Sequence, residues 1–190
     1  MRNSFYDIAR SRCVGAISYG VVRSRSNEAV RRVISMNHRK CKNMEEIIRI
    51  KKLDEAARIP TYGSAGAAGA DLYALLDKEL TIGPGKTEMV HTGLQMEIPE
   101  GYAGLVYARS GLASKRHLAP ANKVGVIDAD YRGEIIVALH NHGEEPQTIA
   151  PGERIAQIVI TPFLRGIFME ASELEETSRG EGGFGSTGRG

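Results

Sequence analysis

From residue 44 onward the sequence has no cysteine, because both cysteines, Cys13 and Cys41, lie earlier in the chain. A disulfide framework is therefore excluded, and a reducing compartment such as the cytoplasm is expected. Long apolar runs are also missing, since no stretch approaches the roughly 20 residues that a membrane-spanning helix needs. The length of 190 residues and a hydrophobic content of 42% are ordinary for one globular domain.

Acidic residues are scarce at the start of the chain, where residues 1–43 carry ten Arg or Lys and only two carboxylates. Basic charge confined to a segment without strand alternation does not indicate a nucleic-acid-binding domain. Three interpretations stay open: a disordered extension with Met36 or Met44 as the true start, an organelle-targeting peptide, and a basic arm that contacts anionic partners. We favour the first, and we expect the domain to span 44–177, with neither nucleic acid nor membrane as a partner.

Three familiar site patterns are incomplete. Gly85-Lys86-Thr87 resembles the end of a P-loop, but the glycine required five positions earlier is Leu80. Residues 180–185 match G-x-G-x-x-G, yet no strand and helix surround them, so a Rossmann site is rejected. His140 and His142 are two metal ligands without a third, and a strand end that runs into a turn is the better interpretation.

Short strands separated by turns dominate what remains. Residues 94–98 alternate apolar and polar side chains, which is the period of a half-buried strand. Residues 134–141 and 154–161 are rich in β-branched side chains, and turn signals such as Pro99-Glu100-Gly101 recur. Only Ser110–Leu118 is expected to be helical. The pattern predicts an all-β, jelly-roll-like β-barrel with one short helix.

The chain ends in a glycine-rich segment, with six glycines among residues 179–190. Glycine loses much backbone entropy on ordering, so such a segment cannot form a packed element alone. We expect residues 178–190 to be a flexible arm that is ordered only by a ligand or partner.

Five segments follow one another in a specific order: AAGADLYA (67–74), YARSGLA (107–113), NKVGVIDADYRG (122–133), ERIAQIVI (153–160) and RGEGGFGSTG (179–188). Each alone has a structural explanation, namely a loop acid, a helix start, a hairpin, a core strand and a flexible tail. Together they resemble the five motifs of the trimeric dUTPase family, over about three quarters of the chain. One departure is Ala108, where many members carry proline.

The resemblance implies hydrolysis of dUTP to dUMP and pyrophosphate by water attack at the α-phosphorus, which keeps uracil out of DNA and supplies dUMP for dTMP synthesis. It implies a homotrimer with sites at subunit interfaces and Mg²⁺ as cofactor, held mainly by the triphosphate and by water, with Asp71 in the outer shell. It assigns to Asp128 the activation of water, and to Tyr131 a place beneath the deoxyribose where a 2′-hydroxyl does not fit. The plain alternatives are a turn-stabilising aspartate and ordinary barrel packing.

The remaining expected substrate contacts also come from the resemblance. Backbone groups of a hairpin would read the uracil edge, so that cytosine would leave buried groups unpaired. The residues expected there are Asn122, Gly125, Val126 and Ile127. The residues expected at the phosphates are Arg109, Ser110, Gly111, Gln157 and, from the arm, Arg179, Gly185, Ser186 and Thr187. Phe184 is expected to stack on the uracil, and the arm to close over the site as a lid.

Two other functions are compatible with the same fold. A dCTP deaminase carries a glutamate on the strand after the hairpin, where this sequence has Ala138, and it lacks a tail of the RGEGGFG type. An inactive trimeric binding module is disfavoured because Asp128, Tyr131, Arg179 and Phe184 are all present.

Overall fold

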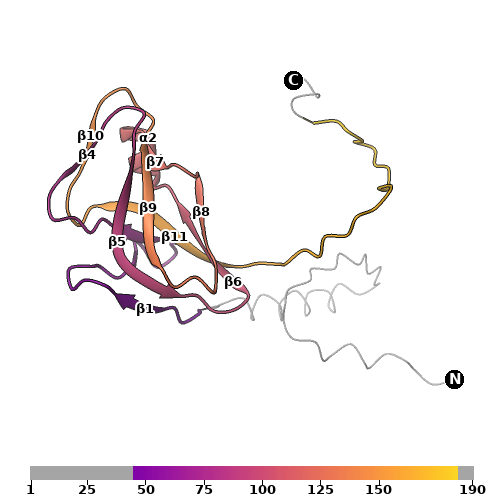
Figure 1. Ribbon diagram of the computed structural model, residues 1–190, viewed down its shortest axis with the longest axis horizontal. Helices are drawn as coiled ribbons and strands as arrows, with labels where there is room; N and C mark the ends of the chain where they lie inside the picture. Colours follow the sequence, from indigo (N-terminus) through magenta and orange to yellow (C-terminus); the bar gives the residue numbers. More distant parts are fainter. Residues whose placement is uncertain (1–44, 184–190) are drawn as a thin grey trace, which may run out of the picture. The chain divides into compact units, whose positions relative to one another are not determined.

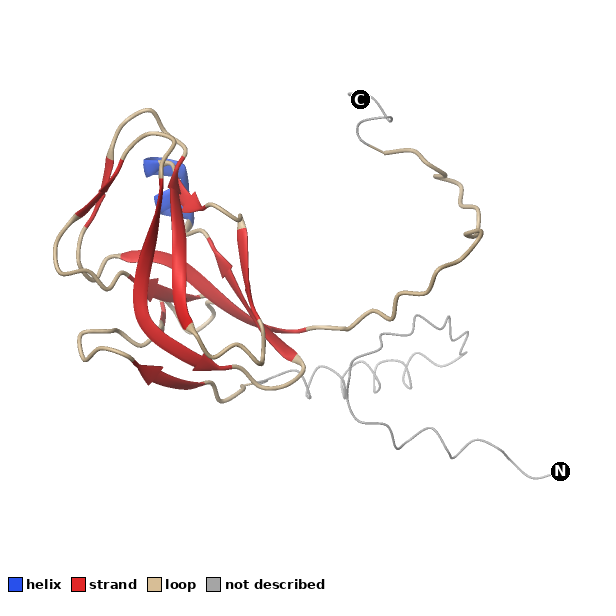
Figure 2. Cartoon of the chain, viewed as in Figure 1, coloured by secondary structure: helices blue, strands red, loops and turns tan. Residues whose placement is uncertain are grey.

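The computed structural model describes residues 45–183. The described part contains strands between residues 49 and 162 and a single helix, α2 (Ser110–Arg116) (Figures 1 and 2). The strands are β1 (Arg49–Lys52), β2 (Thr61–Tyr62), β3 (Ala70–Tyr73), β4 (Leu80–Ile82), β5 (Thr87–Glu97), β6 (Tyr102–Tyr107), β7 (Leu118–Pro120), β8 (Val124–Ile127), β9 (Glu134–Asn141), β10 (Gln147–Ile149) and β11 (Arg154–Pro162).

All strand pairs are antiparallel, and they form three sheets. One sheet has the order β1-β5-β9-β7, a second has the order β2-β3-β11-β6-β8, and a small one pairs β10 with β4. Figure 1 shows β5 and β9 of the first sheet side by side, β11 of the second sheet crossing them, and α2 at one end. The expected all-β, jelly-roll-like fold with one short helix is confirmed, although the strands of the described part are divided among these sheets and no closed barrel is assigned.

The core lies between the two large sheets, because each presents one apolar face to the other. In β9, every second residue from Ile135 to Asn141 is buried, as the two-residue period of a strand requires. Leu94, Met96 and Ile98 are at most 3% exposed, so the expected half-buried strand is confirmed within and just after β5.

The helix ends two residues earlier than expected. His117 adopts a left-handed conformation with φ 55° and ψ 24°, and Leu118 begins β7. A residue in that conformation ends an α-helix because the next backbone groups cannot continue the hydrogen-bond ladder. Leu112, which is 5% exposed, anchors the helix to the core.

The His140-Asn141-His142 segment is a strand end that runs into a turn, as expected. Asn141 is fully buried, and its side-chain amide donates hydrogen bonds to the carbonyls of Ile82 and Glu145. Within residues 45–183, no cluster of His, Cys, Asp or Glu could hold a metal ion, and no helix is long and apolar enough to cross a membrane.

Candidate active site

Asp71, on β3, is a buried carboxylate that accepts hydrogen bonds from two arginines. Arg109 Nε lies 2.7 Å from one carboxylate oxygen, and Arg154 Nη1 lies 3.1 Å from the other. Asp71 is 9% exposed, whereas the Arg154 side chain is 51% exposed. Two guanidinium groups against one carboxylate leave a net positive charge beside open solvent. This cluster therefore suits an anion with several oxygens, such as a polyphosphate.

Three neighbouring strands hold this cluster together. Gln157 of β11 is paired with Asp71 on β3 and with Tyr107 at the end of β6. The Gln157 amide nitrogen donates to the Ala108 carbonyl over 2.9 Å, which fixes the segment that leads to Arg109. The structure thus brings together three expected site residues that are far apart in sequence. It adds Arg154, which the sequence analysis missed although it lies in the fourth segment.

The start of α2 lies next to this cluster. Arg109 is the residue before the first helical turn, and no side chain caps that end of the helix. The first backbone N–H groups of a helix have no partner within it. Ser110 and Gly111 are exposed at this point, so a hydroxyl and backbone N–H groups lie beside the Arg109 guanidinium, as the resemblance implies. Such groups suit phosphate oxygens.

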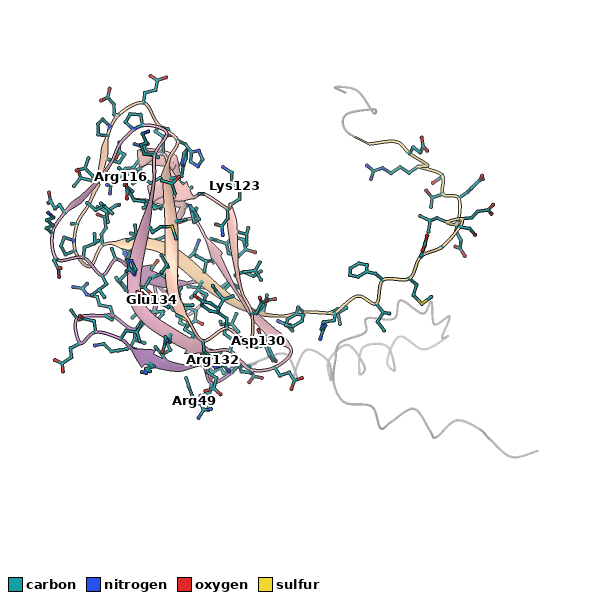
Figure 3. The ribbon with its side chains drawn as sticks, viewed as in Figure 1. Arg49, Arg116, Lys123, Asp130, Arg132 and Glu134 are labelled. Atoms are coloured by element: carbon teal, nitrogen blue, oxygen red, sulfur yellow. The ribbon has the colours of Figure 1, made fainter. Side chains whose placement is uncertain are left out.

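The other end of α2 is held by Arg116, another residue that the sequence analysis did not select. Its Nη1 lies 2.5 Å from Glu153 Oε1, and its Nε donates to the side-chain oxygen of Gln147 over 3.2 Å. Glu153 also accepts a hydrogen bond from the Ala150 N–H over 3.0 Å. These contacts tie the helix to the turn before β11; Arg116 is labelled in Figure 3. The only sequence signals were a basic residue in the last helical turn and an acid beginning the fourth segment.

The segment expected to read uracil differs from the expected hairpin. β7 pairs with β9 in one sheet and β8 pairs with β6 in the other, so Asn122 lies in a turn that connects the two sheets. Lys123 in that turn has a φ of 64°. β8 is an edge strand, and every second residue of an antiparallel edge strand turns its N–H and C=O away from its partner. Backbone groups of alternate residues in β8, the strand that contains Gly125, Val126 and Ile127, are therefore available.

Asp128 and Tyr131 lie in the tight turn that follows β8. The Tyr131 N–H donates to the Asp128 carbonyl over 3.2 Å, and the Tyr131 hydroxyl donates to the Glu134 carbonyl over 2.9 Å. Gly133 makes room for the phenol, because a Cβ at that position would lie 2.3 Å from the tyrosine oxygen. Asp128 and the Tyr131 ring both remain exposed, the latter at 42%.

The expected site residues of one chain fall into two separate groups. Val124 is paired with Tyr107, two residues before Arg109, whereas Ile127, just before Asp128, is paired with Gly104. The two groups therefore lie at opposite ends of this ladder, and three strand steps alone separate them by roughly 10 Å. Asp128 instead faces a groove of about 1080 Å³, whose other lining residues include Ala129, Asp130, Arg132 and residues 97–101. Asp71, Arg109 and Gln157 do not line this groove.

Comparison with known proteins gives the same assignment for most of the chain. A family model described as dUTPase matches residues 55–188, which is well over half of the sequence. The chain belongs to the dUTPase family. A deoxyuridine 5′-triphosphate nucleotidohydrolase of Desulfitobacterium hafniense is 57% identical over 136 residues, covering 71% of this chain and 90% of that protein. The enzyme of the same name from Syntrophotalea carbinolica is 48% identical, covering 74% and 96%.

Solved structures of dUTPases share the fold. A variant of the Staphylococcus bacteriophage 80alpha dUTPase with dUpNHpp superimposes with a TM-score of 0.69 at 29% identity, covering 76% of this chain and all of that one. A variant of the dUTPase from phage phi11 of S. aureus, described as coordinating a structural Mg(II) ion, has a TM-score of 0.62 at 25% identity and covers 69% of this chain and all of that one.

The dUTPase chain continues beyond β11 without further strands or helices among residues 163–183. Several large apolar side chains there are exposed, including Ile167 at 90% and Phe168 at 99%. Arg179 donates from Nε to the Gly182 carbonyl over 2.6 Å in a local turn. Of the residues expected in the arm, Phe184, Gly185, Ser186 and Thr187 lie outside the described residues. The predicted limits of domain and arm stay predictions.

Proposed function

We propose that this protein is a dUTP diphosphatase, which hydrolyses dUTP to dUMP and pyrophosphate. The observation that carries the proposal is the match of the dUTPase family to residues 55–188, together with a cationic cluster suited to a triphosphate. The product supplies dUMP for dTMP synthesis, and the reaction keeps uracil out of DNA. The absence of cysteine from residue 44 onward supports the cytoplasm as the compartment.

In the proposed reaction, Asp128 accepts a proton from a water molecule as the water oxygen attacks the α-phosphorus. The new P–O bond forms as the bond between the α-phosphorus and the bridging oxygen breaks, so that pyrophosphate leaves with the bonding electrons. Exposure of Asp128 on the large groove supports this role, since both water and substrate can reach it. Arg109, Ser110, Gly111 and Gln157 bind phosphate oxygens on the cationic side of the site, and Arg154 adds a second guanidinium.

Recognition of the nucleoside is assigned to the segment around β8. The free edge of β8 supplies rigidly placed donors and acceptors for uracil, and Asn122 supports the turn at its start. The ring of Tyr131 lies beneath the sugar and leaves no space for a 2′-hydroxyl. A site that pairs its polar groups with one base rejects another base by leaving those groups unpaired.

Magnesium fits the residues present, provided that the triphosphate supplies most of its ligands. Asp71 is the one carboxylate in the cationic cluster, and both of its oxygens accept hydrogen bonds from arginines. It could hold only the outer water shell of the ion, in keeping with the tendency of Mg²⁺ to retain water. When bound, the ion neutralises phosphate charge.

We further propose that the active unit is a homotrimer. The separation of Asp128 from Arg109 within one chain supports this assembly, since a complete site then needs residues from neighbouring copies. The arm from Arg179 onward, with Phe184 on the uracil and Gly185, Ser186 and Thr187 on the phosphates, would close the site from a third copy.

The test is pyrophosphate release from dUTP, with UTP, dTTP and dCTP measured in parallel and ammonia release followed in every reaction. We expect pyrophosphate from dUTP, far weaker activity with the other nucleotides, and no ammonia. Ammonia from dCTP would replace the proposal with a deaminase. Comparable kcat/KM values for dUTP and UTP would refute the role of Tyr131.

A further inference from the structure

Glu134, the first residue of β9, links the loop that carries Asp128 and Tyr131 to the neighbouring strand β5. Its Oε2 lies 2.8 Å from His91 Nδ1, and its Oε1 accepts the Gly93 N–H over 2.7 Å. Its backbone carbonyl accepts the Tyr131 hydroxyl over 2.9 Å. One residue, labelled in Figure 3, thus joins the tyrosine to β5 through its backbone on one side and its carboxylate on the other.

The part of β5 that receives this carboxylate is irregular. His91 is paired with Ile136 and Gln95 with Glu134, so β5 has two extra residues between these pairs. Gly93 at the centre of the irregularity has a φ of 68°, and a Cβ there would lie 2.6 Å from Leu75. The Thr92 hydroxyl donates to the Ile135 carbonyl over 2.6 Å. The bulge turns the Gly93 N–H toward Glu134, and an unpaired N–H there would be costly.

Glu134 binds this bulge as an anion. Burial raises the pKa of its carboxyl, but the hydrogen bonds from His91 and from the Gly93 N–H outweigh burial and bring the pKa below its ordinary value. The side chain is 19% exposed, so solvent competes weakly for these contacts. Charge-assisted bonds of this kind are short and directional.

Tyr131, by contrast, is one of the exposed large side chains of the described residues. The residue is 42% exposed, its phenol donates a hydrogen bond to the Glu134 carbonyl, and its oxygen lies over Gly133. A half-exposed ring whose hydroxyl is bound to a carbonyl shifts when that carbonyl moves. The position of the phenol therefore depends on the anchoring of Glu134.

We propose that Glu134 is a positioning residue that fixes Tyr131 for the selection of deoxyribose over ribose. The inference rests on the proposed dUTPase function and adds a residue that does not touch the substrate. Excluding one oxygen atom requires the ring to stay within a fraction of an ångström of its place, since a small displacement opens space for the 2′-hydroxyl. Release of the Glu134 carboxylate should weaken discrimination between sugars more than it weakens turnover of dUTP.

The experiment measures kcat/KM for dUTP and for UTP in the full-length trimer and compares their ratio. Glu134→Ala removes both side-chain bonds, and we expect the dUTP:UTP ratio to fall about tenfold, as for the loss of one positioning hydrogen bond. Glu134→Gln retains an oxygen for the Gly93 N–H and should keep the ratio within about threefold of wild type. Ile149→Val destabilises the core at the distant small sheet and should leave the ratio unchanged.

A double-mutant cycle tests the route through the tyrosine. Tyr131→Phe keeps the ring and removes the hydroxyl bond, so it should lower the ratio as Glu134→Ala does, and the double variant should be little worse than either single variant. Should Glu134→Ala fail to assemble, His91→Ala removes one of the two carboxylate contacts and should lower the ratio by a smaller factor.

Three results overturn the inference: an unchanged ratio in folded Glu134→Ala, an unchanged ratio in His91→Ala where Glu134→Ala does not assemble, and full additivity with Tyr131→Phe. The wild-type protein distinguishes failure of this inference from failure of the proposed function. If the wild-type protein does not hydrolyse dUTP, the proposed function itself is refuted.

Discussion

Mixing two inactive variants should restore dUTP hydrolysis if the site is shared between copies of the chain. The variants are Asp128→Asn, which lacks the proposed base, and Arg109→Ala, which lacks the guanidinium bonded to Asp71. Loss of a positioned base lowers turnover by about 10²–10⁴-fold, so the first homotrimer should be nearly inactive. The second loses a charge-assisted contact to phosphate and leaves Asp71 with Arg154 as its one remaining arginine partner.

The expected recovery follows from the separation of the two residues. Because Asp128 and Arg109 lie at opposite ends of the β6–β8 ladder, each site should combine Asp128 of one copy with Arg109 of another. After equal amounts of the two variants are unfolded and refolded together, random assembly leaves about one quarter of the sites with both residues intact. Turnover per chain should therefore reach about one quarter of the wild-type value.

A second mixture provides the control. Wild-type chains co-refolded with the double variant Asp128→Asn/Arg109→Ala should also retain about one quarter of the sites when each site spans two copies. If one chain supplied both residues, the first mixture would stay inactive and the second would keep about one half. Subunit exchange is checked with two affinity tags and native mass spectrometry. Inactivity of the first mixture despite demonstrated exchange would refute the shared site.

Three further predictions concern Asp128, the two ends of the chain and Glu134. Asp128→Asn should bind a non-hydrolysable dUTP analogue with near wild-type affinity in calorimetry, while a tenfold weaker affinity would give Asp128 a binding role. A chain that starts at Met44 should form trimers with full turnover. A chain that ends before Arg179 should also form trimers but should lose most of its activity. Loss of assembly in either shortened chain would contradict the proposed domain limits. Glu134→Gln should be less stable than wild type to urea at pH 7, and this difference in stability should shrink below pH 4.5, the ordinary carboxyl pKa. The reason is that a carboxyl whose pKa is lowered in the folded state contributes stability that is lost as the pH falls through that lowered pKa. A difference that stays constant down to pH 3 would show that the Glu134 charge is not involved.

The strands themselves were predictable from local pattern. Residues 94–98 could be placed because a strand with one buried face alternates apolar and polar side chains, and residues 134–141 because they are rich in β-branched side chains. The short helix could be placed because it lies between two β-rich runs. The point where it ends could not be placed, because a left-handed residue such as His117 has no strong composition signal.

Pairing partners and long-range ion pairs were not predictable in the same way. The short runs of β7 and β8 are consistent with one hairpin, and nothing local in them indicates that the two strands join different sheets. For the same reason, the contacts of Arg116 with Glu153 and of Glu134 with His91 could not be foreseen, since they depend on strand register across the fold. The five motifs provided the expected site residues, but they did not indicate that Arg116, Glu153, His91 and Glu134 hold the neighbouring segments in place.

The two halves of the proposed site differ in how they are built, and this difference favours assembly. The cationic half lies on β3 and β11, with neighbours on both sides, and is fixed by a nearly buried carboxylate. The nucleoside half lies on β8, an edge strand whose Val126 is 60% exposed. An exposed edge with an apolar side chain is a liability for a lone chain, because it can pair with other edges. A neighbouring copy that brings its cationic cluster to this edge would cover the edge and complete the site in one step. The exposure of β8 in the single chain is therefore what a site completed between subunits requires.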